Sequence, residues 1–428
     1  MPHTEPLSGL DAAFLALDSP GNPMHMGAVG VFQPDGQVNG ERLRTLLADR
    51  AKRIPRLRLR VRDTWFPPGG AEWERDPVFD VTRHVRVHRA SDPHDPTLLA
   101  RYASDWMART LPHGAPPWQL DLLTGLPGGQ FALLLKLHHA LTDGAGAVQV
   151  AAGLFDGMPP QPDPPAPEPE DRSWRSQLDG VVSAARNGWD VVRATRPLHA
   201  SPLAASSSAA RRLAFVRIDA ADLRVIRKRH GGTPNDVAIA VLSGALRSWL
   251  RARGERVAGL TLRALIPVSL RARTSGDGNR LSGYLCDLPV GVADPLRRLA
   301  TVRACMDRNK TAGPQTGPGT LPLLANQIPV QLHRLFTGFA GMSGNALFDT
   351  TVTNVPLPSI PLEVDGAPLR AAYPVVPLAP GQAIGVALSS YRDGVHIGFN
   401  ANANAAPDIG ALADAVEKET AILHELCS

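Results

Sequence analysis

The sequence predicts an α/β (α+β) protein of two domains, each a mixed sheet flanked by helices. A chain of 428 residues, 43% of them apolar, exceeds one ordinary core and suits two domains of about 200 residues. Segments typical of strands alternate with helical segments along both halves. Residues 158–169 are rich in proline, so neither a helix nor a central strand can continue through them. We therefore expect domains at 1–157 and 213–428, joined by a linker and crossover at 158–212.

Three segments before residue 130 have a residue pattern that predicts a helix or a strand. Residues 56–62 alternate arginine with apolar residues, so a strand there would put four arginines on one face. We interpret these arginines as a solvated sheet face or edge rather than as an anion site, because no glycine-rich phosphate loop adjoins them. Residues 80–89 predict an exposed strand, and 98–111 predict a helix.

A strand-to-helix turn follows and is the most informative part of the chain. The nearly continuous apolar run at 131–137 predicts an interior strand, and 144–152 predicts a helix. Between them lies His138-His139-Ala140-Leu141-Thr142-Asp143-Gly144. Two imidazoles and a carboxylate thus fall at a position where side chains commonly face a cleft.

The second half predicts further alternation. An amphipathic crossover helix is expected at 174–192. The other expected elements are strands at 213–218, 260–268, 350–354, 384–391 and 395–399, and helices at 221–230, 234–251, 323–339 and 409–426.

The heptapeptide that begins at His138 matches HHxxxDG, the signature of the CoA-dependent acyltransferase superfamily, which includes chloramphenicol acetyltransferases and condensation domains. The opening of the chain, from Pro6 to Gly27, resembles that of bacterial wax ester synthase/diacylglycerol acyltransferases. Seven ordered blocks are far more specific than HHxxxDG alone. The later blocks of that family lie at 116–118, 235–237, 266–271, 278–280 and 353–356.

This resemblance implies two chloramphenicol-acetyltransferase-like domains with the active site at their interface. It also implies transfer of a fatty acyl group from acyl-CoA to diacylglycerol or a long-chain alcohol. Three departures leave the acceptor open: Pro117 replaces the usual Leu, Leu357 replaces the usual Gly, and Asn400–Asn404 lacks an Asp. An acyltransferase acting on a natural-product hydroxyl or amine is therefore one alternative, and a non-catalytic lipid-binding scaffold is another.

His139 is the expected catalytic residue. A neutral imidazole can accept a proton from an alcohol, and the resemblance gives this role to the second histidine of the motif, with His138 in support. Without the resemblance, a histidine at a strand end is more often structural. Asp143 either orients the site or caps the next helix, and we favour the cap. Gly144 would keep a side chain away from the reacting carbonyl.

Four further residues are weaker candidates. Asn235 lies in a helix start, and that local role explains its position; the resemblance adds that it could face His139 across the interface. Trp118 is expected to pack beneath the site rather than contact substrate. Ser269 and Arg271 follow a strand of the second half and are candidates for substrate binding.

Other chemistries fit the sequence poorly. Adjacent histidines rarely aim at one metal ion, and no third histidine lies at helical spacing. No Gly-x-Ser-x-Gly elbow occurs, so no covalent acyl-enzyme is expected. Cys286, Cys305 and Cys427 are widely spaced and predict reduced thiols. We expect no metal and no resident cofactor, with acyl-CoA as a substrate.

The charge of the chain bears on its partners. A formal charge of +5 and a pI of about 9.4 favour anionic partners, but 5% aromatic residues and the lack of a known motif argue against nucleic acid. The sequence contains no apolar run of about 18 residues, the length that a membrane-spanning helix needs. It also shows no secretory signal, so we expect a cytoplasmic protein. The basic segment 224–229 suggests peripheral association with anionic membranes or lipid droplets; alternatively, it solvates a helix or binds coenzyme A phosphates.

Overall fold

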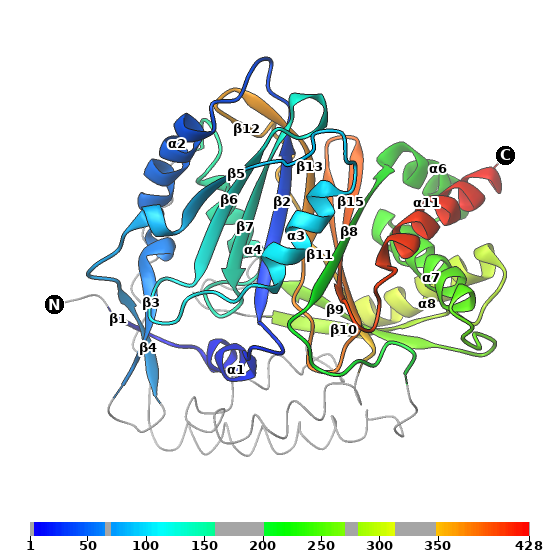
Figure 1. Ribbon diagram of the computed structural model, residues 1–428. Coiled ribbons are helices and arrows are strands. Elements are labelled where there is room, and N and C mark those ends of the chain that lie inside the picture. The colour runs from blue at the N-terminus through cyan, green and yellow to red at the C-terminus, as the bar shows by residue number, and fades with distance from the viewer. Residues whose placement is uncertain (1–3, 65–69, 159–200, 270–280, 313–347, 428) are drawn as a thin grey trace.

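The computed structural model describes residues 4–64, 70–158, 201–269, 281–312 and 348–427. They form two six-stranded mixed sheets and a small three-stranded sheet near the N-terminus. Figure 1 shows β2, β5, β6 and β7 of the first large sheet in blue to cyan with β12 and β13 in orange, the second large sheet in green to orange, and helices against both. The predicted fold class is confirmed. The crossover helix at 174–192 and the helix at 323–339 lie outside the described residues.

The first large sheet is built around the predicted interior strand. It contains β2 (His25–Phe32), β5 (Val85–Arg89), β6 (Trp118–Thr124), β7 (Phe131–His138), β12 (Glu363–Val364) and β13 (Ala367–Val375). The order is β12-β13-β2-β7-β6-β5, and only β5 and β6 run parallel. Every residue of β7 is buried, as a strand covered on both faces requires.

Helices cover both faces of this sheet. Their bounds are α1 (Gly9–Leu17), α2 (Gly40–Lys52), α3 (Leu98–Ala108) and α4 (Gly144–Ala152). Apolar residues of α2 and α4 share one core with one face of β6 and β7, whereas α3 packs on the opposite face. The predicted helix at 144–152 is confirmed, and the one predicted at 98–111 ends at Ala108.

Two predicted strands are wrong in their first halves. A 3₁₀ helix occupies Pro55–Arg58, because the proline ring fixes φ at a value that suits a helical turn. The strand β3 (Leu59–Asp63) begins only after it and pairs with β4 (Ala71–Arg75), which also pairs with β1 (Thr4–Pro6). A second 3₁₀ turn, Val81–Arg83, precedes β5.

The arginines of β3 lie at a sheet edge, as expected, because β3 is the outer strand of the three-stranded sheet, but they form ion pairs there. Arg60 donates to Glu74 at 2.8 Å, and Arg62 pairs with Glu72 and Glu74 of the neighbouring strand. Opposite charges on adjacent strands stabilise a pair of strands in this way.

The second large sheet follows the predicted pattern closely. Its strands are β8 (Arg211–Asp219), β9 (Leu262–Ser269), β10 (Leu281–Leu288), β11 (Thr350–Asn354), β14 (Ile384–Tyr391) and β15 (Gly394–Asn402). The order is β10-β9-β11-β14-β15-β8, with β11 parallel to both neighbours. The helices are α6 (Ala220–His230), α7 (Pro234–Ala252), α8 (Pro295–Ala312) and α11 (Ile409–Glu425). The sequence pattern did not predict β10 or α8.

The predicted domain at 213–428 needs a correction, because β12 and β13 belong to the first sheet. β13 pairs with β2 and also approaches the second sheet: Ser389 donates its hydroxyl to Ala372 O at 2.6 Å, and Asn400 Nδ2 donates to Val376 O at 2.9 Å. A Cβ at Gly398 would lie 2.1 Å from Pro374 O, so only glycine permits this approach. The two sheets are therefore joined through β13.

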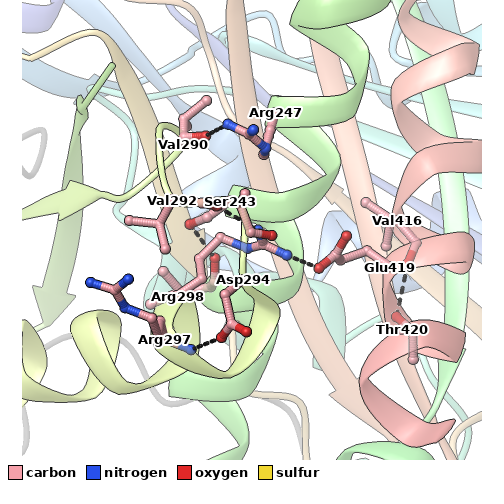
Figure 2. A network of polar contacts seen from close by, with 12 residues as sticks. Ser243, Arg247, Val290, Val292, Asp294, Arg297, Arg298, Val416, Glu419 and Thr420 are labelled. Atoms are coloured by element: carbon pink, nitrogen blue, oxygen red, sulfur yellow. Dashed lines mark hydrogen bonds and ion pairs between the residues drawn. The ribbon is translucent and has the colours of Figure 1, made fainter. Parts of the chain in front are cut away.

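A buried ion pair connects the helices behind the second sheet (Figure 2). Arg298 of α8 pairs with Glu419 of α11, and both residues are buried. The same guanidinium donates to Val292 O at 2.8 Å. A Cβ at Gly244 of α7 would overlap the Glu419 carboxylate, so glycine lets three helices converge there.

Candidate functional site

The HHxxxDG turn starts at the end of β7 and is fixed by its own main chain. His138 N–H donates to Pro117 O, and Leu141 N–H donates to His138 O, both at 2.9 Å. Ala140 N–H donates to His138 Nδ1 at 3.1 Å. Because Nδ1 accepts, a neutral His138 carries its proton on Nε2.

The carboxylate of the turn caps the following helix. Asp143 is the N-cap of α4, and its Oδ1 accepts from Gly146 N–H at 2.8 Å. The predicted cap is thus confirmed. A Cβ at Gly144 would lie 4.0 Å from Val355 Cγ2, so the start of α4 faces the residues that follow β11 in the second sheet.

His139 is held by α1 and the loop after it. The Phe14 ring stacks on the imidazole, with centroids 3.9 Å apart and planes inclined by 24°. His139 N–H donates to Met24 O at 2.9 Å. Burial lowers the pKa of His139 to about 4, although its own backbone carbonyl and the Asp143 charge act in the opposite direction. At neutral pH the ring is therefore uncharged and can accept a proton.

His138 lies deeper and faces an acidic group. Its Nε2 lies 3.8 Å from Asp18 Oδ2, which is too long for a hydrogen bond. Asp18 Oδ1 accepts from Met24 N–H at 2.8 Å, so Asp18 also braces the loop that holds His139. Burial, followed by the nearby His139 and His113, lowers the pKa of His138 to about 3. This position suits a supporting residue.

Arg56 also reaches the turn, contrary to its predicted place on a solvated face. Its Nε donates to Leu141 O at 2.7 Å, and its Nη1 pairs with Glu5 at 2.9 Å. The guanidinium lies 5.4 Å from the Trp73 ring centroid, a distance typical of cation–π contacts. Arg56 therefore fixes the carbonyl in the middle of the motif.

The second half contributes Asn235 to this region. Thr233 and Asp236 form a capping box at the start of α7, as the sequence predicts. Asn235 Oδ1 accepts from Asn354 Nδ2 at 3.3 Å. Since the next residue, Val355, faces Gly144, the structure brings the 235–237 and 353–356 blocks to the HHxxxDG turn.

The remaining candidates lie elsewhere or are not described. Trp118 is 1% exposed, its Nε1 donates to Leu57 O at 2.7 Å, and its ring stacks on His84 at 4.5 Å. It occupies the packing position expected from the sequence. Ser269 ends β9, and Arg271 lies outside the described residues. Within the described ranges, no three His, Cys, Asp or Glu side chains are grouped as metal ligands.

The comparisons with known proteins agree with this arrangement. The wax ester synthase/diacylglycerol acyltransferase catalytic domain matches residues 7–194, and the C-terminal domain of the same family matches residues 277–424. A probable diacylglycerol O-acyltransferase of Mycobacterium tuberculosis is 31% identical over 97% of this chain and 95% of its own. The chain belongs to the wax ester synthase/diacylglycerol acyltransferase family. It is an acyltransferase.

Solved structures show the same fold. A wax ester synthase/diacylglycerol acyltransferase from Marinobacter aquaeolei VT8 superimposes with a TM-score of 0.77 at 24% identity, covering 99% of both chains. The starter condensation domain of rhizomide synthetase gives a TM-score of 0.56 at 17% identity, covering 99% of this chain and 94% of its own. The resemblance to acyltransferases and condensation domains thus holds at the level of the fold.

Three residues at the turn were not among the sequence candidates: Phe14, Asp18 and Arg56. The first two lie within the opening block that resembles the family, at 6–27, and that block was the available signal. Nothing in the local sequence connects Arg56 with Leu141, which is 85 positions away.

Proposed function

We propose that this enzyme transfers a fatty acyl group from acyl-CoA to the hydroxyl of diacylglycerol or a long-chain alcohol, giving triacylglycerol or wax ester. Membership of the family supports the reaction type, and the names of the mycobacterial relatives favour diacylglycerol as the acceptor. The observation that carries the proposal is an uncharged imidazole at the HHxxxDG turn, with motif residues of the second sheet beside it.

His139 acts as the general base in this proposal. Nδ1 of His139 is buried, so we assign Nε2 as the ring nitrogen that meets the acceptor hydroxyl. Nε2 takes the hydroxyl proton as the oxygen attacks the thioester carbonyl carbon. The tetrahedral oxyanion then collapses, the C–S bond breaks, and the thiolate of coenzyme A takes the proton from His139. Atoms and charge balance without a covalent enzyme intermediate.

The other site residues position this base. His138 and Asp18 support the loop that holds His139, and Asp143 fixes the start of α4. Gly144 leaves space between the turn and Val355. Asn235, oriented by Asn354, is proposed to contact the oxyanion or the acceptor hydroxyl through its amide.

Peripheral membrane or lipid-droplet association is a second part of the proposal. In the described part of the chain, no helix has the length and apolar character needed to cross a membrane. The surface of α6 and α11 combines cations with apolar side chains that are 42–44% exposed: Arg224, Lys228 and Arg229 with Val225, Ile422 and Leu426. Clustered cations attract anionic lipid, and exposed apolar groups can insert shallowly.

Two assays test these proposals. Purified protein is incubated with labelled acyl-CoA and a panel of diacylglycerols, long-chain alcohols and natural-product alcohols and amines. We expect label in triacylglycerol or wax ester; transfer confined to the natural-product acceptors would favour the alternative, and no transfer would contradict the proposal. Flotation with anionic and neutral liposomes at low and high salt tests the surface. Equal recovery in the unbound fraction under all conditions would exclude membrane association.

A further inference from the structure

A small polar cavity, partly open to solvent, lies where four distant segments of the chain meet. The walls come from the loop before β2, the segment that leads into β8, the loop between β13 and β14, and the end of β15. The side chains that matter for its chemistry are those of Asn22, Ser208, Arg211, Gln382 and Asn402.

Arg211 brings a positive charge to this cavity and is only 6% exposed. Its guanidinium donates to two main-chain carbonyls, Ser208 O and Ala210 O. The contacts that the described residues make with this guanidinium are to main-chain carbonyls, and burial alone lowers its pKa, to about 10. Neutral carbonyls do not offset a buried charge, so the free energy of this site favours a counter-ion.

Two buried side-chain amides of this cavity have N–H groups that donate to no acceptor among the described residues. Gln382 is 3% exposed, and its Oε1 accepts from Ala379 N–H at 3.1 Å. This contact fixes the amide orientation, so Nε2 is the free end, and it has no acceptor among the described residues. Asn22 Nδ2 is buried and likewise lacks an acceptor there. Buried donors of this kind cost free energy until an acceptor arrives.

We propose that this cavity is a binding site for a small oxyanion of the phosphate class. The three groups that need a partner are all hydrogen-bond donors, and one of them is cationic. A group with several acceptor oxygens and negative charge can satisfy all of them, whereas a metal ion or a second donor cannot.

The position of the site gives the bound anion a structural effect. Asn22 lies in the loop between Asp18 and Met24, and Met24 O accepts the His139 N–H at 2.9 Å. An anion held by Asn22, Arg211 and Gln382 ties this loop to the segment entering β8 and to the β13–β14 loop. The anion is either a free oxyanion or a phosphate of coenzyme A, which presents the same chemistry.

Isothermal titration calorimetry with sodium phosphate tests the site, with sodium chloride at equal ionic strength as the reference. We expect saturable phosphate binding to the wild type, weakened at least tenfold by Arg211→Gln. Gln382→Glu is the sharper variant, because it keeps the acceptor for Ala379 N–H and supplies a fixed negative charge beside Arg211. Phosphate binding is lost while the protein stays folded. Gln37→Glu makes the same charge change at an exposed position and leaves binding unchanged.

A titration with coenzyme A separates the two sources. Weaker coenzyme A binding to Gln382→Glu assigns the site to a phosphate of the coenzyme; unchanged coenzyme A binding beside lost phosphate binding assigns it to a free oxyanion. The proposal is overturned if the wild type shows no saturable phosphate binding, or if both Arg211→Gln and Gln382→Glu bind phosphate as the wild type does. These readouts do not depend on acyl transfer.

Discussion

Two buried polar clusters in this molecule differ in charge: one is an ion pair, and the other consists of uncharged imidazoles. Behind the second sheet, Arg298 and Glu419 are both buried and lie against each other. At the end of β7, burial leaves His138 and His139 uncharged. A buried ion pair fixes the helices that carry it, whereas an uncharged imidazole remains able to accept a proton. The first cluster therefore serves stability, and the second serves chemistry.

Breaking the ion pair should give the largest effect. Arg298→Met leaves Glu419 buried without its cation, so the free energy of unfolding should fall by about 3–5 kcal/mol, measured by urea denaturation. The double variant Arg298→Met/Glu419→Leu removes both charges and should recover much of the loss. Equal destabilisation of the single and double variants would contradict this account of the cluster.

Removing the base should separate activity from stability. His139→Ala should lower the rate of acyl transfer about a hundredfold or more, measured with labelled acyl-CoA, with little change in the melting temperature. His138→Ala serves as the matched variant and should cost less activity. Near-normal turnover by a well-folded His139→Ala protein would show that another group is the base.

The helix cap at Asp143 tests whether this residue contributes mainly to stability or to activity. Asp143→Asn removes a negative charge from the helix N-terminus and should lower the free energy of unfolding by about 0.5–1 kcal/mol, measured by denaturation. Turnover by the folded protein should change less. A normal melting temperature beside abolished turnover would mean that Asp143 organises the site rather than the helix.

Changing the ring that stacks on His139 should alter the rate of acyl transfer only several-fold. Phe14→Leu removes an aromatic contact of about 0.5–1.5 kcal/mol and frees the imidazole to rotate, so kcat should fall several-fold with KM little changed. Phe14→Tyr keeps the ring and should retain activity. Equal rates for Phe14→Leu and the wild type would show that stacking by Phe14 does not position the His139 imidazole for the reaction.

The sequence predicted the parts of the site that depend on local order. The segment from Phe131 to Ala152 contains its strand, turn, cap and helix, and Thr233 likewise defines the start of α7. Each of these elements follows from neighbouring residues, so the pattern alone was sufficient.

Contacts between residues that are distant in the sequence could not be predicted from local patterns. Arg56 binds Leu141 O because Pro55 turns the chain into a 3₁₀ helix, which the alternating pattern concealed. β13 joins the first sheet because Gly398 lets its main chain approach β15, and no local property of 367–375 identifies β2 as its partner. Phe14 and Asp18 likewise act across the fold.

An NMR titration of the His139 imidazole tests the central claim most directly, with the signal assigned by its absence in His139→Gln. In the folded protein we predict a pKa of about 4, against about 6.5 in the urea-unfolded chain. Because the unfolded chain then binds protons that the folded chain does not, stability falls as the pH drops below about 6.5 toward 4. A folded-state midpoint at or above 6.5 would contradict the claim that burial keeps this base uncharged.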